Sequence, residues 1–256
     1  MIDPRAILAP DAEIGAGVVI GAFTVIGPGV KIGDGCWVGP HAVINGPTTL
    51  GRQNKVFQFA SVGDAPQDKK YAGEPTRLEV GDRNVFREFC TINRGTVGGR
   101  NVTRIGDDCL FMAYSHVAHD SIVGNRCVLS NCTALAGHVE LGDWVILSGY
   151  SAIHQYCKIG AHAFLANNAA VTRDVPPYLL VAGSPAEPKG INSEGLKRRG
   201  FEAGQISNIK NAYRLLYRSG LKLAEAEAQL KELAASQPEL VPFVNFLSSS
   251  ERSIIR

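Results

Sequence analysis

Hydrophobic residues recur at every sixth position along most of this chain. The register comprises eleven hexads that start at residues 2–62, three at 80–92 and twelve at 105–171, and each hexad begins with a hydrophobic residue. A glycine often comes second, as in IGAGVV and IGDGCW. A period of six matches neither the 3.6-residue turn of a helix nor the two-residue alternation of a simple strand.

Six-residue repeats are typical of a β-solenoid in which each hexad forms one side of a coil, so that three hexads complete a triangle. We expect the first residue of each hexad to point inward, and Gly or Asn residues to accommodate the turns between sides. The fifth position should also face inward, because small residues usually occupy it. Five of the six cysteines stand there and are expected to be buried rather than to bind metal: Cys36, Cys90, Cys109, Cys127 and Cys157.

Two polar segments break the register, near residues 65–77 and 98–104, and we expect them to loop out of the solenoid. Loops that project from a rigid scaffold often carry function. Proline and glycine residues at 174–186 end the coils, and from about Asn192 the hydrophobic residues follow spacings of three and four. The sequence therefore predicts a solenoid domain over residues 1–190 and a helical domain over residues 191–256.

The composition narrows the function classes. A formal net charge of +2, without a long basic run, argues against nucleic-acid binding. No apolar run approaches the roughly 20 residues that a membrane span needs. The N-terminal segment MIDPRAILAPDAEIG also lacks the basic and apolar regions of a signal peptide. We therefore expect a cytoplasmic protein with reduced cysteines.

Four of the six histidines are expected on one side of the solenoid. Positions three hexads apart stack on the same side, with successive coils about 4.8 Å apart. By this spacing His119, His138 and His154 fall in successive hexads of one side, and His116 immediately precedes the first of these hexads. We interpret the remaining two as surface or turn residues: His41 and His162.

The residues alone leave three interpretations of this cluster. It is a polar surface, a metal site built on histidine, which is a common zinc ligand, or an acid–base pair. Against the metal site, the three stacked histidines occupy different positions of their hexads, so they need not point at one centre. In favour of the acid–base pair, a histidine titrates near neutral pH and Asp120 directly follows His119, where it could fix the tautomer.

Several segments resemble one protein family. The hexads resemble those of left-handed parallel β-helices, an exception to the usual right-handed crossover. Over essentially the whole chain the sequence is similar to the UDP-N-acetylglucosamine 3-O-acyltransferases of lipid A biosynthesis, in these segments and in this order: QDKKYAGEPTR, TINRGTV, HVAHDSIVGNRCVLSNCTALAGHV, IHQYCKIGAH, DVPPY and NSEGLKRRGF.

The resemblance implies transfer of an (R)-3-hydroxyacyl group from acyl carrier protein to the 3-hydroxyl of UDP-N-acetylglucosamine. It implies that His119 is the general base, that Asp120 orients it and that the Gly137 N–H stabilises the oxyanion. It also implies a homotrimer and no resident metal or cofactor, since the phosphopantetheine of acyl carrier protein carries the donor. The implied substrate contacts are Asp68, Lys70, His116, His138, His154, Gln155, Asn192, Glu194, Arg198 and Arg199.

Two positions depart from or qualify the resemblance. Asn93 stands where the family often has His, which removes one polar contact. Asn167 occupies the position that limits acyl length in the family, so we expect a chain of about ten to twelve carbons, because methylenes are discriminated at such a site. The alternative interpretation of the basic residues 197–199 is a solvent-exposed helix face that makes no phosphate contact.

Rival functions remain open. A sugar with a 3-amino group is the alternative acceptor. The related N-acyltransferases carry a uridine-binding domain ahead of their coils, whereas the hexads here begin at Ile2. A zinc hydratase and a non-catalytic trimeric scaffold are the remaining rivals.

Overall fold

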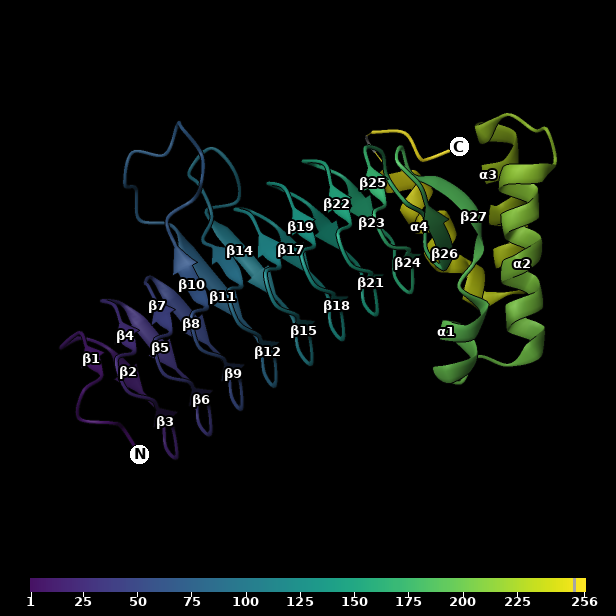
Figure 1. Ribbon diagram of the computed structural model, residues 1–256. Coiled ribbons are helices and arrows are strands. Elements are labelled where there is room, and N and C mark those ends of the chain that lie inside the picture. The colour runs from purple at the N-terminus through teal and green to yellow at the C-terminus, as the bar shows by residue number, and fades with distance from the viewer. Residues whose placement is uncertain (251) are drawn as a thin grey trace.

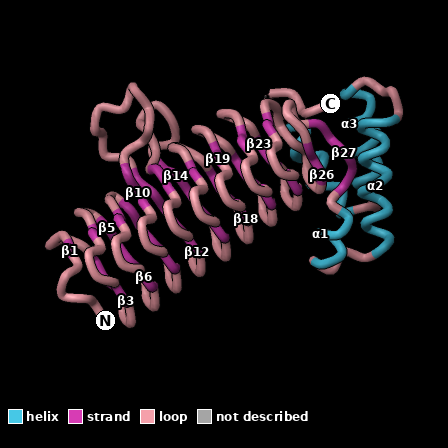
Figure 2. The backbone as a smooth tube through the Cα atoms, in the orientation of Figure 1, coloured by secondary structure: helices cyan, strands magenta, loops and turns pink. Residues whose placement is uncertain are grey.

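The chain folds into a long triangular prism of stacked coils with helices at its C-terminal end (Figure 1). The computed structural model describes residues 1–250 and 252–256. Successive short strands of the coils join three sheets in turn, and we call these sheets faces 1, 2 and 3 after the order of strands β1, β2 and β3. Figure 2 shows these strands as brief segments joined by turns at the corners.

The first two faces are wholly parallel. Face 1 has nine strands, β1 (Ile7–Leu8), β4 (Val25–Ile26), β7 (Val43–Ile44), β10 (Ser61–Asp64), β13 (Thr91–Asn93), β16 (His116–Val117), β19 (Ala134–Leu135), β22 (Ala152–Ile153) and β25 (Ala170–Val171). Face 2 has eight, β2 (Glu13–Ile14), β5 (Val30–Ile32), β8 (Thr48–Leu50), β11 (Arg77–Val80), β14 (Val102–Ile105), β17 (Ile122–Val123), β20 (Glu140–Leu141) and β23 (Lys158–Ile159).

Face 3 ends with an antiparallel pair, in which the last strand turns back along its neighbour. Its ten strands are β3 (Val19–Ile20), β6 (Trp37–Val38), β9 (Lys55–Val56), β12 (Val85–Phe86), β15 (Leu110–Phe111), β18 (Val128–Leu129), β21 (Ile146–Leu147), β24 (Phe164–Leu165), β26 (Leu179–Ala182) and β27 (Glu187–Ile191).

Equivalent hexad positions pair directly across coils. Val117, Leu135 and Ile153 are successive partners on face 1, each three hexads after the last. All three are buried, as are the other first-position residues from Ile20 onward. The first-position side chains thus point inward from their short strands, and the stack of such side chains forms one continuous core.

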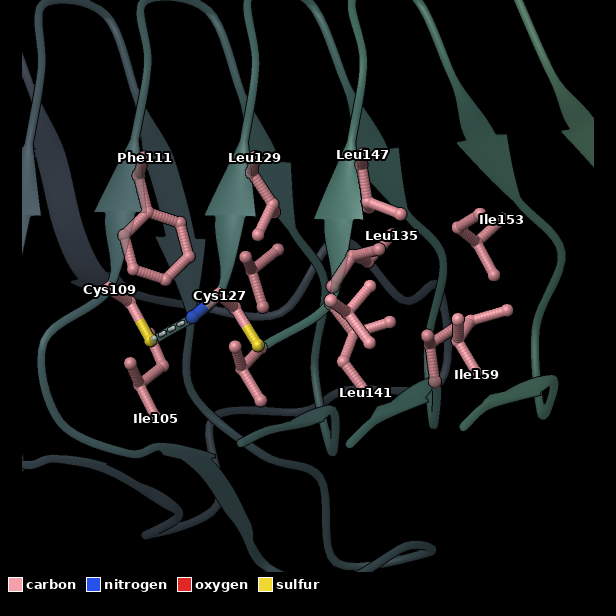
Figure 3. Packing of buried hydrophobic residues seen from close by; sticks show 14 of the residues in the cluster. Ile105, Cys109, Phe111, Cys127, Leu129, Leu135, Leu141, Leu147, Ile153 and Ile159 are labelled. Carbon is pink, nitrogen blue, oxygen red and sulfur yellow. Dashed lines mark hydrogen bonds between the residues drawn. The ribbon is translucent and has the colours of Figure 1, made fainter. Parts of the chain in front are cut away.

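The fifth hexad position also faces inward, as predicted. The five cysteines at that position are buried, and no cysteine of the described chain is in a disulfide. In the core, Cys109 and Cys127 lie in adjacent coils, and the Cys127 N–H donates to the Cys109 sulfur over 3.3 Å (Figure 3). Burial of small apolar side chains accounts for these thiols.

The turns are less restricted in residue type than predicted. The fourth hexad position adopts the left-handed region of φ with aromatic, histidine and aspartate side chains as well as glycine. His41, Asp120 and His138, for example, have φ values of 58°, 60° and 64°. The regular hydrogen bonding of the stacked coils therefore imposes this conformation at a cost that glycine would avoid.

Both insertions leave the prism at the corner between faces 1 and 2, which we call corner 1–2. They rise side by side above β10 and β14 (Figure 1). The second lies earlier in the chain than predicted, because β13 ends at Asn93 and β14 begins at Val102, where residues 102–104 pair with β11. Both loops therefore stand at the corner to which His119 belongs.

The helical end comprises α1 (Ser193–Arg198), α2 (Ala203–Arg218), α3 (Leu223–Ala234), a 3₁₀ turn η1 (Pro238–Leu240) and α4 (Val241–Ser249). The chain then returns to the prism, where Ile254 pairs with Asp174 and is buried. None of the helices in the described residues has both the length and the apolar character that a membrane crossing requires.

Candidate active site

His119 and Asp120 form a hydrogen-bonded pair at corner 1–2. The His119 Nδ1 lies 2.8 Å from the Asp120 Oδ2. Asp120 is fully buried, whereas His119 is partly exposed. The left-handed φ of Asp120 turns the chain directly after His119. Because Nδ1 faces the carboxylate, the Nε2 edge of the imidazole faces away from Asp120.

The second insertion surrounds Asp120 with donors. The Thr96 hydroxyl donates to Oδ2 over 2.6 Å, and the Arg100 N–H donates to Oδ1 over 2.8 Å. Burial acts against ionisation of Asp120, but the hydrogen bonds from His119, Thr96 and Arg100 outweigh it and lower the pKa of the carboxyl to about 2. Asp120 is therefore a carboxylate at every physiological pH.

His138 joins this pair from the next coil. Its ring lies edge-on to that of His119, with centroids 5.2 Å apart, and its Nε2 is 3.8 Å from the Asp120 Oδ2. Tyr156, one coil further, stacks on His138 with centroids 4.3 Å apart. Burial is the main cause that lowers the pKa of His138, which favours its neutral form.

His119 and His138 converge although they occupy different hexad positions. One ligand atom each from His119, Asp120 and His138 lies within 4.8 Å of the others, a spacing that could hold a metal ion. The carboxylate of Asp120, however, already accepts hydrogen bonds from His119, Thr96 and Arg100. A metal at this carboxylate would have to displace some of these donors.

Gly137 lies against the His119 ring. A Cβ atom on Gly137 would be 2.6 Å from the His119 Cε1 and 2.8 Å from its Nε2. The flanking residue His138 donates its N–H to the His119 carbonyl oxygen over 3.0 Å. Within the described residues, the Gly137 N–H itself has no hydrogen-bond acceptor. The backbone therefore approaches the imidazole closely with a free donor.

A cavity of about 240 Å³ opens between the two insertions and this corner. Its walls include Asp68 and Lys70 from the first loop, Thr96 and Gly98 from the second, and His138 and Tyr156 from the coils. The structure thus brings Asp68 and Lys70 together with His138. Within the first loop, Asp68 accepts the Lys70 N–H over 3.0 Å, which shapes the turn.

His116, His154 and Gln155 lie around this corner but do not join the pair. His116 is on face 1, where its Nδ1 is 2.7 Å from the Thr91 hydroxyl, and burial lowers its pKa. His154 and Gln155 are exposed one coil beyond Gly137. The Arg252 guanidinium contacts both the His154 Nδ1 and the Gln155 carbonyl oxygen.

The residues that the resemblance assigns to the nucleotide occupy another corner, between faces 2 and 3. Asn192 caps α1 by accepting the Gly195 N–H and also donates to the His162 carbonyl oxygen over 2.9 Å. His162, predicted as a surface or turn residue, is in a turn, but α1 and its neighbours cover it. Burial lowers its pKa to about 4, with the charge of Arg199 as a second cause.

The two arginines that follow differ in their surroundings. The Arg199 guanidinium lies 5.0 Å from the centroid of the Trp144 ring and 3.1 Å from the His162 Nδ1. Arg198 is exposed. Glu194, also exposed, is paired with Lys197 over 2.8 Å. Arg198 is therefore the freer of the two cations.

Asn167 stands at the third corner, between faces 3 and 1, and is exposed. The proposed base, the proposed nucleotide contacts and the proposed acyl-length residue thus occupy three different corners of one prism. In the described residues of a single chain, these three groups do not line any one of the cavities found around the corners.

Comparisons with known proteins show the family of this chain. A model described as UDP-N-acetylglucosamine O-acyltransferase, domain 2, matches residues 174–255, and one described as bacterial transferase hexapeptide (six repeats) matches residues 1–28 and 103–137. The acyl-(acyl-carrier-protein)–UDP-N-acetylglucosamine O-acyltransferase of Thiobacillus denitrificans is 54% identical over 255 residues, covering 100% of this chain and 99% of that protein. The chain belongs to this acyltransferase family.

Other members of the acyltransferase family are similar over their full length. The enzyme of the same name from Stutzerimonas stutzeri is 50% identical over 256 residues, covering 100% of this chain and 99% of that protein. The solved UDP-N-acetylglucosamine acyltransferase of Francisella novicida superposes with a TM-score of 0.98 at 41% identity, covering 100% of this chain and 94% of that one. A structure from Acinetobacter baumannii gives 0.97 at 43% identity, covering 100% and 99%. These matches confirm the predicted left-handed parallel β-helix.

Three residues at the candidate active site were missed by the sequence analysis: Thr96, Arg100 and Tyr156. A signal existed for Tyr156, which follows His138 by three hexads and so must stack on it. For Thr96 and Arg100 the only signal was their place in or beside an insertion, which does not reveal the path of the loop over Asp120.

Proposed function

We propose that this protein transfers an (R)-3-hydroxyacyl group from acyl carrier protein to the glucosamine 3-hydroxyl of UDP-N-acetylglucosamine, in the cytoplasm, as the first step of lipid A biosynthesis. Full-length similarity to enzymes named for this donor class and this sugar nucleotide supports the substrates. The His119–Asp120 pair supports the chemistry, because a base with a fixed tautomer is what hydroxyl attack on a thioester requires.

In this mechanism the Nε2 of His119 accepts the proton of the 3-hydroxyl as its oxygen attacks the thioester carbonyl. Asp120 holds Nδ1–H and stabilises the imidazolium that forms. The C–S bond then breaks, and His119 returns the proton to the departing phosphopantetheine thiolate. The sugar oxygen is itself the nucleophile, so no acyl-enzyme and no resident cofactor are required.

The Gly137 N–H is the proposed oxyanion donor. Gly137 lies against the His119 ring, and its N–H has no acceptor within the described residues. A free backbone donor that is fixed by the coils can stabilise the developing charge without reorganisation. His138 stays neutral because of its burial, so it is suited to contact the sugar or acyl group as a hydrogen-bond partner.

A homotrimer accounts for the distribution of the remaining residues. The proposed nucleotide contacts and Asn167 lie at corners other than the one that carries His119. Assembly of three prisms would place different corners of neighbouring chains together and close the open cavity beside His138. His154, Gln155, Glu194 and Arg198 are exposed, and would contact substrate across such an interface.

A second opening of about 430 Å³ adjoins His138 and Tyr156 on the side of the C-terminal segment. Three cationic side chains line it together with two carboxylates: Arg100, Lys158, Arg252, Glu140 and Asp174. Acyl carrier protein is acidic, so the exposed Arg252 at this mouth favours its approach, more weakly at high salt.

The single observation that carries the base assignment is the hydrogen bond from His119 Nδ1 to a buried, ionised Asp120. Replacing His119→Ala should lower kcat by about 10²–10⁴-fold, the usual contribution of a general base. His41→Ala at another corner is the matched control and should retain activity. Mass spectrometry of the product also distinguishes ester from amide, and hence a hydroxyl from an amine acceptor. If His119→Ala remained fully active, the base would have to be another group.

Asn167 is proposed to set the acyl length at about ten to twelve carbons, because its side chain shortens the space for the chain and methylenes in such a groove are discriminated by about 10-fold or more. Kinetics with hydroxyacyl carrier proteins of ten, twelve and fourteen carbons test this. Asn167→Gly should shift the preference toward longer chains. A clear preference of the unmodified enzyme for fourteen carbons would contradict the proposal.

A further inference from the structure

The second insertion packs tightly over the carboxylate of Asp120. The backbone N–H groups of Thr96 and Arg100 and the Thr96 hydroxyl all donate to this carboxylate. A Cβ atom on Gly99 would lie 2.5 Å from the carboxyl carbon of Asp120. Yet residues 97–100 are themselves exposed to solvent. A thin, exposed piece of chain therefore excludes water from the carboxylate that orients the proposed base.

The Arg100 side chain ties this piece of chain to two coils. Its Nη1 donates to the backbone carbonyl oxygen of Asp120 over 2.8 Å, and its Nη2 pairs with the Glu140 carboxylate. Glu140 begins β20, two residues after His138, so the guanidinium bridges the coils of His119 and His138. The backbone bonds of Thr96 and Arg100 alone would leave the far end of the loop without a side-chain anchor.

We infer that Arg100 is a positioning residue, whose guanidinium, anchored by Glu140, holds the second insertion closed over Asp120 and so keeps His119 in its reactive orientation. The expected change in kcat rests on the proposed function, whereas the closure of the second insertion over Asp120 does not depend on it. Arg100 acts through Asp120 and is not required to touch substrate.

The chain offers a matched control in Arg104. This residue lies in β14, directly after the same insertion, and pairs with Glu79 over 2.8 Å. Arg100 and Arg104 therefore each form an ion pair with a glutamate of face 2. The Arg104 guanidinium has no hydrogen bond to Asp120 in the described residues. Arg104→Met removes an equivalent ion pair without loosening the cover of the carboxylate.

The test compares Arg100→Met, Arg100→Lys, Glu140→Gln and Arg104→Met in the full-length protein. We expect Arg100→Met to lower kcat by between about tenfold and a hundredfold, a usual cost of slight misplacement of a catalytic group, with the KM for the sugar nucleotide little changed. Arg100→Lys should recover part of the loss, because an ammonium can still donate to one of the two acceptors. Glu140→Gln should give a smaller loss, and Arg104→Met none.

Hydrogen exchange supplies a readout that is independent of activity. The amides of Thr96 and Arg100 should exchange faster in Arg100→Met than in the unmodified protein, whereas Arg104→Met should leave them protected. Unchanged exchange in Arg100→Met would overturn the inference even if the protein proved to catalyse another reaction. Equal loss of kcat in Arg100→Met and Arg104→Met would also overturn it. Absence of acyl transfer in the unmodified protein would instead count against the proposed function.

Discussion

Two corners of the prism use the same backbone turn for different purposes. At the corner between faces 2 and 3, the third residue of a hexad is often Asp or Asn, and its side chain accepts the N–H of the third residue in the preceding coil. Such bonds join Arg52 to Asp82, Asp107 to Asn125 and Asn125 to Asp143 over 2.7–2.9 Å. At corner 1–2 the same position holds His119 and Gly137, and the Gly137 N–H has no such acceptor in the described chain.

The difference lies in side-chain choice and not in the fold. At the corner between faces 2 and 3, the Asp and Asn side chains form a ladder of acceptors from coil to coil. This ladder binds backbone N–H groups to which the stacking of the coils gives no other partner. At corner 1–2, glycine and histidine leave one donor unsatisfied beside a base. A donor that is left open at a fixed position is available to a ligand. We therefore expect substitutions at the two corners to separate activity from stability.

Asp120→Asn should have the largest effect on activity. Asp120 accepts from His119, Thr96 and Arg100 together, and an amide can replace only one of its two oxygens. We expect kcat to fall by about 10²–10⁴-fold, because the imidazole loses its orienting acceptor. Asp107→Asn at the corner between faces 2 and 3 is the matched control. It should leave kcat nearly unchanged, because an asparagine, Asn125, already stands at the equivalent hexad position in the next coil. Similar steady-state losses in both variants would contradict the distinction between the corners.

Gly137→Ala should come next. The added Cβ would meet the His119 ring at 2.6 Å, so the ring must move although the backbone conformation allows alanine. We expect kcat to fall by about tenfold to a hundredfold, as for other small displacements of a catalytic group. Gly149→Ala is the control, since Gly149 is the third residue of its own hexad and its Cβ would only approach the Asn131 carbonyl oxygen to 3.4 Å. Equal activity of the two alanine variants would show that the contact with His119 is unimportant.

Sequence periodicity predicted most of the fold, because burial requires a hydrophobic residue at the first position of every hexad whatever the rest contains. The three-hexad spacing also placed His119 and His138 in neighbouring coils. It could not predict that the left-handed turn at the fourth position brings His138 toward Asp120. Side-chain direction at a corner depends on this turn, which the sequence pattern marks only where glycine is present.

The environment of Asp120 was beyond sequence reasoning for a different reason. The insertion was recognisable as a break in the register, but its path depends on hydrogen bonds from Thr96 and Arg100 that no period encodes. The hexad count already implied that Asn167 lies at another corner than His119. The place of Asn192, which lies beyond the hexads, depends on its contact with His162 and could not be counted from the register.

The pH dependence of the unfolding free energy tests whether folding favours the ionised form of Asp120. Its pKa is lowered from 3.8 to about 2 in the folded protein, so the folded state favours the carboxylate. This contribution is present above pH 4 and is lost as the pH falls toward 2, amounting to up to about 2 kcal/mol per chain. Chemical denaturation at several pH values should therefore show the difference in unfolding free energy between the unmodified protein and Asp120→Asn shrinking over that window. A constant difference would mean that Asp120 is not preferentially ionised on folding.

The smallest effect should come from breaking the ladder itself. Asn125→Ala removes the side-chain acceptor of the Asp107 N–H, a bond of 2.9 Å at an exposed corner. We expect a loss of about 1 kcal/mol in the free energy of unfolding, since water can replace part of this hydrogen bond. Activity should be unchanged, because the ladder faces away from His119 and lies across face 2 from corner 1–2. Denaturant melts and steady-state assays on the same preparation measure both quantities, and a loss of activity without a loss of stability would reverse the roles assigned to the two corners.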